Sequence, residues 1–381
     1  MPIGNSACII RAKKPPKTKI LELTNFVLGG NHAFGIDSNN NLLVWGSNSY
    51  GELGLRNTDL TKHYVETQAS NSSWLGASAG KNFSMHIRSD GSLYAYGLNN
   101  PSGQLGKDAA SLKDTSIPTR IGTDTWTKIK CGVDFTLGVT KDNKLWGWGN
   151  NIDGRLGNKS FGNIETVPFN TGITNVNDMA CGGSHSIILK STGNIWGAGN
   201  NFLGQLGLGH TNKVSSSTQI GTSTWTKIAC GTGHTLAIKS DGTLWTWGLN
   251  SYGALGFGDN TDRSSPTQIG TDTWTQIDCG SYHSAAIKSD GTLWTWGNNE
   301  YGQLGLGDKI NRSVPVQVGT DLWSQVKCTR NNSTTDTTLA NKLDNTLWGW
   351  GFNSGLTAGL LGYKSVYQDY ITSPSKIKYL A

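Results

Sequence analysis

The amino-acid sequence predicts an all-β protein, a seven-bladed β-propeller with four-stranded antiparallel blades, and three observations support this fold class. A Gly preceded by an aromatic or small residue recurs about every fifty residues along the chain. Each copy contains four short runs with strand-type patterns between turn residues, and no helical periodicity is convincing. The composition is rich in Gly (51) and Trp (15) and only 15% charged, which is typical of turn-rich β structure.

The recurring Gly marks seven copies of a repeat. The chain has 381 residues, more than the roughly 250–300 residues at which a single core stops growing, so an array of repeats is expected. Seven four-stranded sheets around an axis protect their edges by radial repetition, as in a β-propeller. The seven glycines are Gly46, Gly97, Gly149, Gly199, Gly248, Gly297 and Gly351.

Four strands can be followed within one copy. The run "SPTQIG" (265–270) contains a proline and suits an outer edge strand, because proline cannot donate to a ladder. The run "WTQIDCG" (274–280) alternates apolar and polar residues. Residues 283–289 and 292–297 flank an Asp-Gly pair, which favours a two-residue hairpin turn with positive φ at both turn positions. Every copy is therefore expected to form one blade.

The ring is expected to close by pairing of its N- and C-terminal segments. Residues 373–381, "SPSKIKYLA", resemble an edge strand, and no further strand of a copy follows them. Residues 19–32 match a copy from its second strand onward. We therefore expect residues 374–380 to complete the first blade. The alternative is residues 15–19, whose prolines also align with the edge-strand proline.

The formal net charge of +6 is concentrated in a basic arm, residues 1–18, which precedes a single propeller domain, residues 19–381. Such an arm could bind nucleic acid or an acidic protein surface. Five charges without interleaved aromatic residues are a weak nucleic-acid signal, so a solvated tail or an arm packed on a neighbour is favoured. The candidate binding residues are Arg11, Lys13, Lys14, Lys17 and Lys19.

The motif W-G-x-N-x-x-G-x-L-G carries a family resemblance. Together with G-x-x-H before a strand and Asp-Gly before the next, it resembles the regulator of chromosome condensation repeat over about residues 20–381, in the style of bacterial and bacteriophage members. The resemblance implies a seven-bladed propeller that serves as a rigid binding platform. The family includes a nucleotide exchange factor for a small GTPase, ubiquitin-ligase modules and a plant ultraviolet-B photoreceptor. The motif stands at 45–54, 148–157, 247–256 and 296–305.

The tryptophans and histidines encoded by the repeat are interpreted as structural. Trp247 and Trp296 represent a Trp row that is expected to pack between blades. Light sensing is disfavoured, because the photoreceptor signature G-W-R-H-T is replaced by "GTGHT" and "GSYHS". One His per blade lacks the spacing of a metal site, and Phe fills the same position in two blades. The histidines at this position are His32, His185, His234 and His283.

The cysteines recur with the same period and are expected to be buried free thiols, which suggests folding in a reducing cytoplasm. Aspartates at the hairpins are explained by turns. We find no catalytic set and no phosphate loop, so the protein is predicted to be non-enzymatic, without a cofactor or a metal. The regular cysteines are Cys131, Cys181, Cys230, Cys279 and Cys328.

Tyr50, Tyr252 and Tyr301 share one position in the loops that follow the motif glycine. Tyrosine is enriched at binding surfaces, although packing within the loops explains the same residues. We therefore treat the three tyrosines as candidate binding residues.

The favoured functional hypothesis is a protein-interaction or structural propeller that forms part of a bacteriophage virion, with virion structural proteins as partners. The neutral polar composition suits an exposed part, whereas no signal peptide or membrane-spanning run is evident and synthesis in the cytoplasm is expected. The alternatives are a cytosolic bacterial scaffold and a guanine nucleotide exchange factor. Exchange activity predicts a projecting hairpin and charged loops, which the short insertions and nearly neutral body do not supply.

Overall fold

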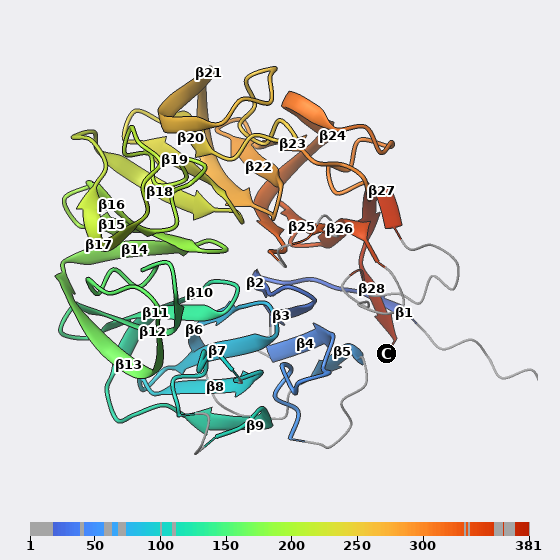
Figure 1. Ribbon diagram of the computed structural model, residues 1–381. Coiled ribbons are helices and arrows are strands. Elements are labelled where there is room, and N and C mark those ends of the chain that lie inside the picture. The colour runs from blue at the N-terminus through green and yellow to red at the C-terminus, as the bar shows by residue number, and fades with distance from the viewer. Residues whose placement is uncertain are drawn as a thin grey trace, which may run out of the picture.

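The computed structural model describes residues 18–38, 42–56, 63–67, 74–99, 101–108, 112–330, 333, 336–353, 361 and 370–380. This part of the chain contains 28 β-strands and no helix, which confirms the all-β prediction. No helix long and apolar enough to cross a membrane is therefore found in these ranges. The antiparallel sheets are arranged around a central axis, as in a β-propeller (Figure 1).

The first four blades are separate four-stranded sheets whose strands pair in chain order. Blade 1 contains β2 (Asn25–Leu28), β3 (His32–Ile36), β4 (Leu42–Gly46) and β5 (His63–Thr67). Blade 2 contains β6 (Trp74–Ala79), β7 (Phe83–Arg88), β8 (Leu93–Gly97) and β9 (Thr115–Arg120). Blade 3 contains β10 (Trp126–Cys131), β11 (Phe135–Thr140), β12 (Lys144–Asn151) and β13 (Asn163–Thr174). Blade 4 contains β14 (Val176–Cys181), β15 (His185–Lys190), β16 (Ile195–Gly199) and β17 (Val214–Gln219).

The remaining blades form a continuous run of ten strands, because two long strands pass from one blade to the next. The run contains β18 (Trp225–Cys230), β19 (His234–Lys239), β20 (Thr243–Gly248), β21 (Arg263–Cys279), β22 (His283–Lys288), β23 (Thr292–Gly297), β24 (Arg312–Cys328), β25 (Thr337–Lys342), β26 (Leu347–Phe352) and β27 (Tyr370–Lys376). Residues 263–273 of β21 pair with β20, and residues 274–279 pair with β22. β24 divides between β23 and β25 in the same way. The described strands therefore form three further four-stranded units.

The hairpin turn between the second and third strands differs from its prediction. Gly291 has a positive φ of 85°, whereas Asp290 is not among the residues with positive φ. The Gly291 N–H donates to the carbonyl of Lys288 over 3.0 Å, and the Asp290 carboxylate accepts the N–H of Thr292 over 2.9 Å. The loop between Lys288 and Thr292 is therefore longer than two residues. It needs positive φ only at Gly291, because the Asp290 side chain caps the turn instead of adopting positive φ.

The core lies between blades rather than within them. The first strand of each blade contacts the first strands of its neighbours, for example β18 with β14 and β21, so these strands surround the axis. Buried side chains from adjacent blades form shared clusters: Phe83 and Leu93 of blade 2 pack with Ile129 and Trp148 of blade 3. A blade therefore buries its apolar surface only when its neighbour is present.

The loop that follows a third strand is here called the exit loop, and in blades 2, 4, 5 and 6 one of its backbone carbonyls accepts two hydrogen bonds from the next blade. In blade 4 the Gln205 carbonyl accepts the indole N–H of Trp247 over 3.0 Å and the hydroxyl of Thr235 over 2.9 Å. Both donors belong to blade 5. The same pair of bonds is made by Trp148 and Thr136 to Gln104, by Trp296 and Ser284 to Ala254, and by Trp350 and Thr338 to Gln303. A buried acceptor with two lone pairs thus satisfies two buried donors.

The repeat histidines complete this arrangement. The Nε2 atom of His185 lies 3.1 Å from the Thr235 hydroxyl, which donates its only hydrogen to Gln205. Nε2 therefore carries the imidazole hydrogen and donates to Thr235. His32, His234 and His283 make the equivalent contact with the hydroxyl of the next blade. Burial lowers the pKa of His32, His185 and His234 to about 3, so these side chains are neutral near pH 7.

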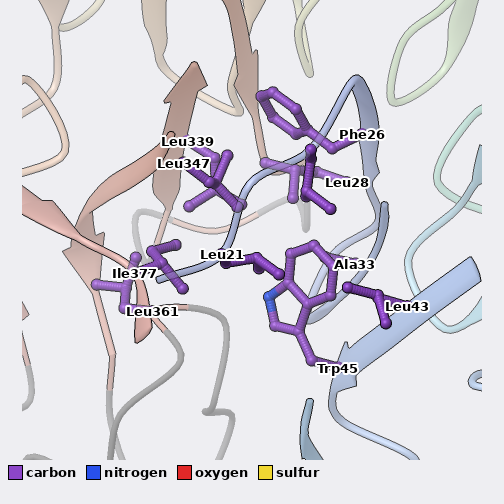
Figure 2. Close-up of a cluster of buried hydrophobic side chains, with 11 residues drawn as sticks. Leu21, Phe26, Leu28, Ala33, Leu43, Trp45, Leu339, Leu347, Leu361 and Ile377 are labelled. Atoms are coloured by element: carbon purple, nitrogen blue, oxygen red, sulfur yellow. The ribbon is translucent and has the colours of Figure 1, made fainter. Parts of the chain in front are cut away.

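The N- and C-terminal segments pair as β1 (Thr18–Ile20) and β28 (Lys378–Leu380), which form a two-stranded antiparallel sheet. Next to it, the N–H of Leu21 donates to Ile377 over 3.0 Å, and Leu347 of blade 7 donates to the Leu21 carbonyl over 3.0 Å. Figure 2 shows Leu21 between Trp45 of blade 1 and Ile377. Leu21 thus joins the last blade to the first.

The prediction that residues 374–380 complete the first blade is wrong. Residues 370–376 form β27, the outer strand of blade 7, and the outer strand of blade 1 is β5. Each outer strand pairs with the third strand that precedes it, so the run assigned to the start of a copy belongs to the previous blade. The alternative, residues 15–19, is not found either: Thr18 and Lys19 pair with β28, and residues 15–17 lie outside the described residues.

Replacement of Leu21 by alanine is expected to destabilise the protein by about 2–5 kcal/mol, because a fully buried leucine is removed from the junction of blades 1 and 7. Urea unfolding followed by tryptophan fluorescence measures the loss. Ile20→Ala is the matched control, since the neighbouring Ile20 is 42% exposed, and it should change the free energy of unfolding by less than about 0.5 kcal/mol. Equal losses for the two variants would contradict the assigned role of Leu21.

Replacement of His185 by phenylalanine is expected to reduce the acid sensitivity of the fold. The pKa of His185 is about 3 in the folded protein, so the unfolded chain, with an ordinary histidine pKa near 6.5, binds one more proton between these values. Folding stability is therefore lost as the pH falls from about 6.5 towards about 3, by about 1.4 kcal/mol per pH unit for this histidine. Phe83 and Phe135 show that the position accepts phenylalanine.

The free energy of unfolding, measured by urea titration between pH 4 and 6, should fall less steeply with decreasing pH in His185→Phe than in the unmodified protein. Ile188→Val is the control, because it removes one buried methyl group and no ionisable group, and it should leave the slope unchanged. An unchanged slope in His185→Phe would show that His185 is not held neutral.

Candidate functional site

The structure buries the repeat tryptophans between blades. Trp247 and Trp296 have no exposed side-chain surface. The ring of Trp247 lies edge-to-face against Trp225 with centroids 5.9 Å apart, and Trp296 lies 6.4 Å from Trp274 in the same way. The indole N–H groups of Trp247 and Trp296 donate to the carbonyls of Gln205 and Ala254, and the edge-to-face ring pairs are typical of buried aromatic side chains. These side chains are part of the fold and are not accessible to a partner.

The five regular cysteines are buried and free. The thiols of Cys181 and Cys230 donate to carbonyls of the preceding blade, at Lys130 and Ala180, over 3.6 Å. Burial raises the pKa of Cys131 and Cys230 to about 12, so these thiols are not nucleophilic near pH 7. Across the described part of the chain, no group of three His, Cys, Asp or Glu side chains is arranged to hold a metal ion.

The structure describes one of the five candidate residues of the basic arm. Arg11, Lys13, Lys14 and Lys17 lie outside the described residues. Lys19 belongs to β1, where its backbone pairs with Tyr379 of β28. The binding role of the arm stays a prediction.

The three exit-loop tyrosines differ in their surroundings. Tyr50 is 40% exposed. The ring of Tyr252 lies 5.4 Å from that of Tyr282, and the ring of Tyr301 lies 5.1 Å edge-to-face from Phe352. Tyr252 and Tyr301 are thus partly covered by neighbouring aromatic rings, whereas Tyr50 presents a large part of its surface to solvent. The structure does not gather the three into one cluster.

An exposed apolar cluster lies instead at the exit loops of blades 3 and 4. We call Ile152, Phe161 and Phe202 the exit-loop patch; their side chains are 50%, 45% and 62% exposed. The ammonium group of Lys213 joins the two aromatic rings, at 5.4 Å from the centroid of Phe161 and 5.8 Å from that of Phe202. The N–H of Gly162, next to Phe161, donates to the carbonyl of Ile152.

Charged groups fix the loop beneath the exit-loop patch. The Arg155 side chain is only 5% exposed, and its guanidinium bonds the carboxylates of Asp134 at 2.8 Å and Asp153 at 2.9 Å. Lys213 lies 3.8 Å from the other oxygen of Asp153. Because Arg155 is held by two carboxylates, the loop that carries Ile152 has a defined conformation. The patch is therefore an apolar surface on a rigid base with a charged rim.

The sequence analysis missed this patch because it selected candidate binding residues at one motif position only, the one that carries Tyr50, Tyr252 and Tyr301. Ile152 and Phe202 occupy the position one residue earlier in the motif, where other blades have Ser49, Ser251 and Glu300. The signal was present in the sequence as two apolar residues at a position that is polar in the other copies. Phe161 could not be assigned in this way, since it lies beyond the motif, in a segment that is one residue longer in blade 3 than in blades 4, 5 and 6.

The comparison with family models identifies the repeat. The model of the regulator of chromosome condensation (RCC1) repeat matches residues 90–139, 142–189, 192–238, 241–287 and 290–334, more than half of the chain. A second model of the same repeat matches five segments, from residues 24–52 to residues 274–303.

Two curated relatives match part of the chain. The X-linked retinitis pigmentosa GTPase regulator of Mus musculus is 30% identical over 139 residues, which is 36% of this chain and 14% of the relative. The ultraviolet-B receptor UVR8 of Arabidopsis thaliana is 32% identical over 133 residues, which is 34% of this chain and 30% of the relative. The match thus spans less than a third of the length of either relative.

Solved structures share the fold over most of the chain. Human WBSCR16 superposes with a TM-score of 0.77 at 23% identity, covering 88% of this chain and 94% of the other. Yeast RCC1 (Prp20), solved with Kap60, superposes with a TM-score of 0.74 at 22% identity, covering 85% and 82%. At this identity the likeness shows the propeller fold alone. From the repeat match over most of its length, the chain belongs to the regulator of chromosome condensation (RCC1) repeat family.

Proposed function

We propose that the protein is a non-enzymatic interaction propeller that binds a partner protein through the exit-loop patch. The observation that carries this proposal is the exposure of Ile152, Phe161 and Phe202 on neighbouring loops. Contiguous exposed apolar surface with a polar rim is uncommon on soluble proteins and marks interaction sites.

The make-up of the patch suits a binding surface. Aromatic side chains are enriched at the centre of protein interfaces, and a surrounding rim of charged groups excludes water and sets orientation. Here Phe161 and Phe202 would supply the apolar contact, and Lys213 and Asp153 the rim. The Arg155 ion pairs keep the loop in one conformation, which lowers the ordering cost of association.

The family relationship supports the proposal that the ligand is a protein, but it does not identify that protein. The yeast Prp20 structures are described as a complex with Kap60 and as a protein with binding properties to Gsp1p and histones. These statements concern Prp20. Nucleotide exchange on a small GTPase is therefore an alternative role for this chain, and it would use the same propeller as a protein-binding platform.

The virion role, the scaffold role and synthesis in the cytoplasm stay predictions. No relative named above is a virion protein. The virion hypothesis rests on the neutral polar composition and on the free buried cysteines. It is distinguished from the others by detection of the chain in purified particles.

Replacement of Phe202 by aspartate is expected to reduce partner recovery at least tenfold in affinity capture from the native source, because a charge is placed in the apolar contact. Quantitative mass spectrometry of the captured proteins measures the effect. Ile310→Asp is the matched control: Ile310 is 64% exposed in the exit loop of blade 6, outside the patch, and its replacement should leave recovery unchanged.

Unchanged recovery with Phe202→Asp would overturn the assignment of the patch. The identity of the partner then separates the roles. A small GTPase whose nucleotide release is accelerated by the protein would establish the exchange-factor alternative, whereas capsid or tail proteins would establish the virion role.

A further inference from the structure

The axis of the propeller holds a channel that is distinct from the exit-loop patch. Alternate side chains of the first strands face the axis and enclose a cavity of about 190 Å³, to which all seven blades contribute. Arg330, which follows β24 in blade 7, closes one end. Its Nη1 donates to the carbonyl of Cys230 in blade 5 over 2.8 Å, and only about 10 Å³ of space is found beyond it.

The channel lining carries an excess of positive charge. Its charged residues are Lys130, Lys227, Lys327, Arg330, Asp178 and Asp278, which leaves two formal positive charges uncompensated. Among described residues, one ion pair joins these groups, between Lys130 and Asp178 at 4.0 Å. The Asp278 carboxylate accepts the backbone N–H of Cys328 over 2.8 Å. A concave site lined by one sign of charge concentrates the opposite sign of ion.

Lys327 is the cation that the protein itself leaves least satisfied. It lies within the channel, and in the described part of the chain no hydrogen bond or ion pair engages its ammonium group. Burial lowers its pKa below the ordinary lysine value, although Asp278 partly opposes this shift. Lys327 is partly buried, and a partly desolvated lysine without a directly paired carboxylate carries a desolvation cost that a bound anion would offset.

The fold does not require a charge at the position of Lys327. The residue before the regular cysteine position faces the channel, and it is alanine in blades 4 and 5, Ala180 and Ala229. The same position carries Lys130, Asp278 and Lys327 in blades 3, 6 and 7. Asp278 has an architectural role, because its carboxylate accepts the Cys328 N–H of the next blade, as the Ser78 hydroxyl accepts the Cys131 N–H at the same position. Lys327 makes no such bond in the described part of the chain, so its charge calls for an explanation other than blade architecture.

We propose that the channel binds a compact, doubly charged oxyanion, of which inorganic phosphate is the simplest, between Lys327 and Arg330. Phosphate carries a charge of about −1.5 to −2 near pH 7, which matches the excess charge of the lining. Each water of the liquid occupies about 30 Å³, so the cavity holds the equivalent of several waters and accommodates a tetrahedral oxyanion. Arg330 keeps donors free, because a guanidinium has five N–H groups and one bonds Cys230.

The test measures thermal unfolding of the full chain in sodium phosphate and in sodium chloride of equal ionic strength, with isothermal titration of phosphate as the direct readout. Isothermal titration is expected to show a saturable heat of phosphate binding, and phosphate is expected to raise the melting temperature more in the unmodified protein than in Lys327→Met, because a ligand that binds only the folded state stabilises it. The variant is compared because phosphate also stabilises folded proteins by exclusion from their surface. Equal effects of the two salts, without heat of binding, would overturn the proposal.

The decisive variant is Lys327→Met. It should weaken phosphate binding by at least tenfold while leaving the melting temperature in chloride equal or higher, since a partly desolvated ammonium without a directly paired carboxylate is removed. Lys141→Met, at an exposed turn of blade 3 outside the channel, is the matched control and should bind phosphate as the unmodified protein does. Full retention of phosphate binding by a folded Lys327→Met variant would overturn the proposal.

Asp278→Asn provides a test of opposite sign. It raises the excess positive charge of the lining by one and keeps an oxygen that accepts the Cys328 N–H, so phosphate binding is expected to tighten. Weaker binding in a folded Asp278→Asn variant would contradict the proposal. A glycerol phosphate titration identifies the source of the ligand: a response larger than that of inorganic phosphate would indicate the phosphoryl group of a metabolite.

Discussion

The structure depends on a backbone carbonyl that recurs in the exit loops of blades 2, 4, 5 and 6. In blade 4 the Gln205 carbonyl accepts the indole N–H of Trp247 and the hydroxyl of Thr235, and that hydroxyl in turn accepts from His185. These donors and acceptors are thereby satisfied by groups of the adjacent blade, and each would cost about 1–3 kcal/mol if it lost its partner. Because the apolar clusters are also shared between blades, neither the polar nor the apolar interior of a blade is complete without its neighbour.

A ring built in this way must solve the junction of its last and first blades separately. Within the ring, the exit loop of one blade accepts hydrogen bonds from the next blade. Between blades 7 and 1, the segment before β2 also forms hydrogen bonds. Leu21 exchanges backbone hydrogen bonds with Ile377 and Leu347, and its side chain packs towards Trp45 (Figure 2). The pairing of β1 with β28 then joins two segments that are distant in sequence but belong to no repeat.

The repeat made the propeller and the nature of its strands predictable. The shared position of His185 and Phe135 indicated a packing role, and the Asp-Gly pairs indicated the hairpins. Pairing partners were harder to predict, since an edge-strand pattern such as residues 265–270 does not reveal whether the strand joins the preceding or the following blade. Side-chain exposure was also not predictable at Phe161, because the loop that carries it is one residue longer than its equivalents in blades 4, 5 and 6.

Function is therefore expected at the positions that the repeat leaves free. A residue such as Trp247 is needed by the junction and is fully buried, so selection for a partner cannot act on it without disturbing the ring. The junction between blades does not require Phe202 or Lys327. Phe202 occupies the position of Ser251 in another copy, and Lys327 occupies the position of Ala229. Their side chains carry costs, exposed apolar surface in one case and a desolvated charge in the other, that the fold alone does not explain. We therefore expect ligands to bind at positions where one copy of the repeat carries a residue that costs stability and the other copies do not.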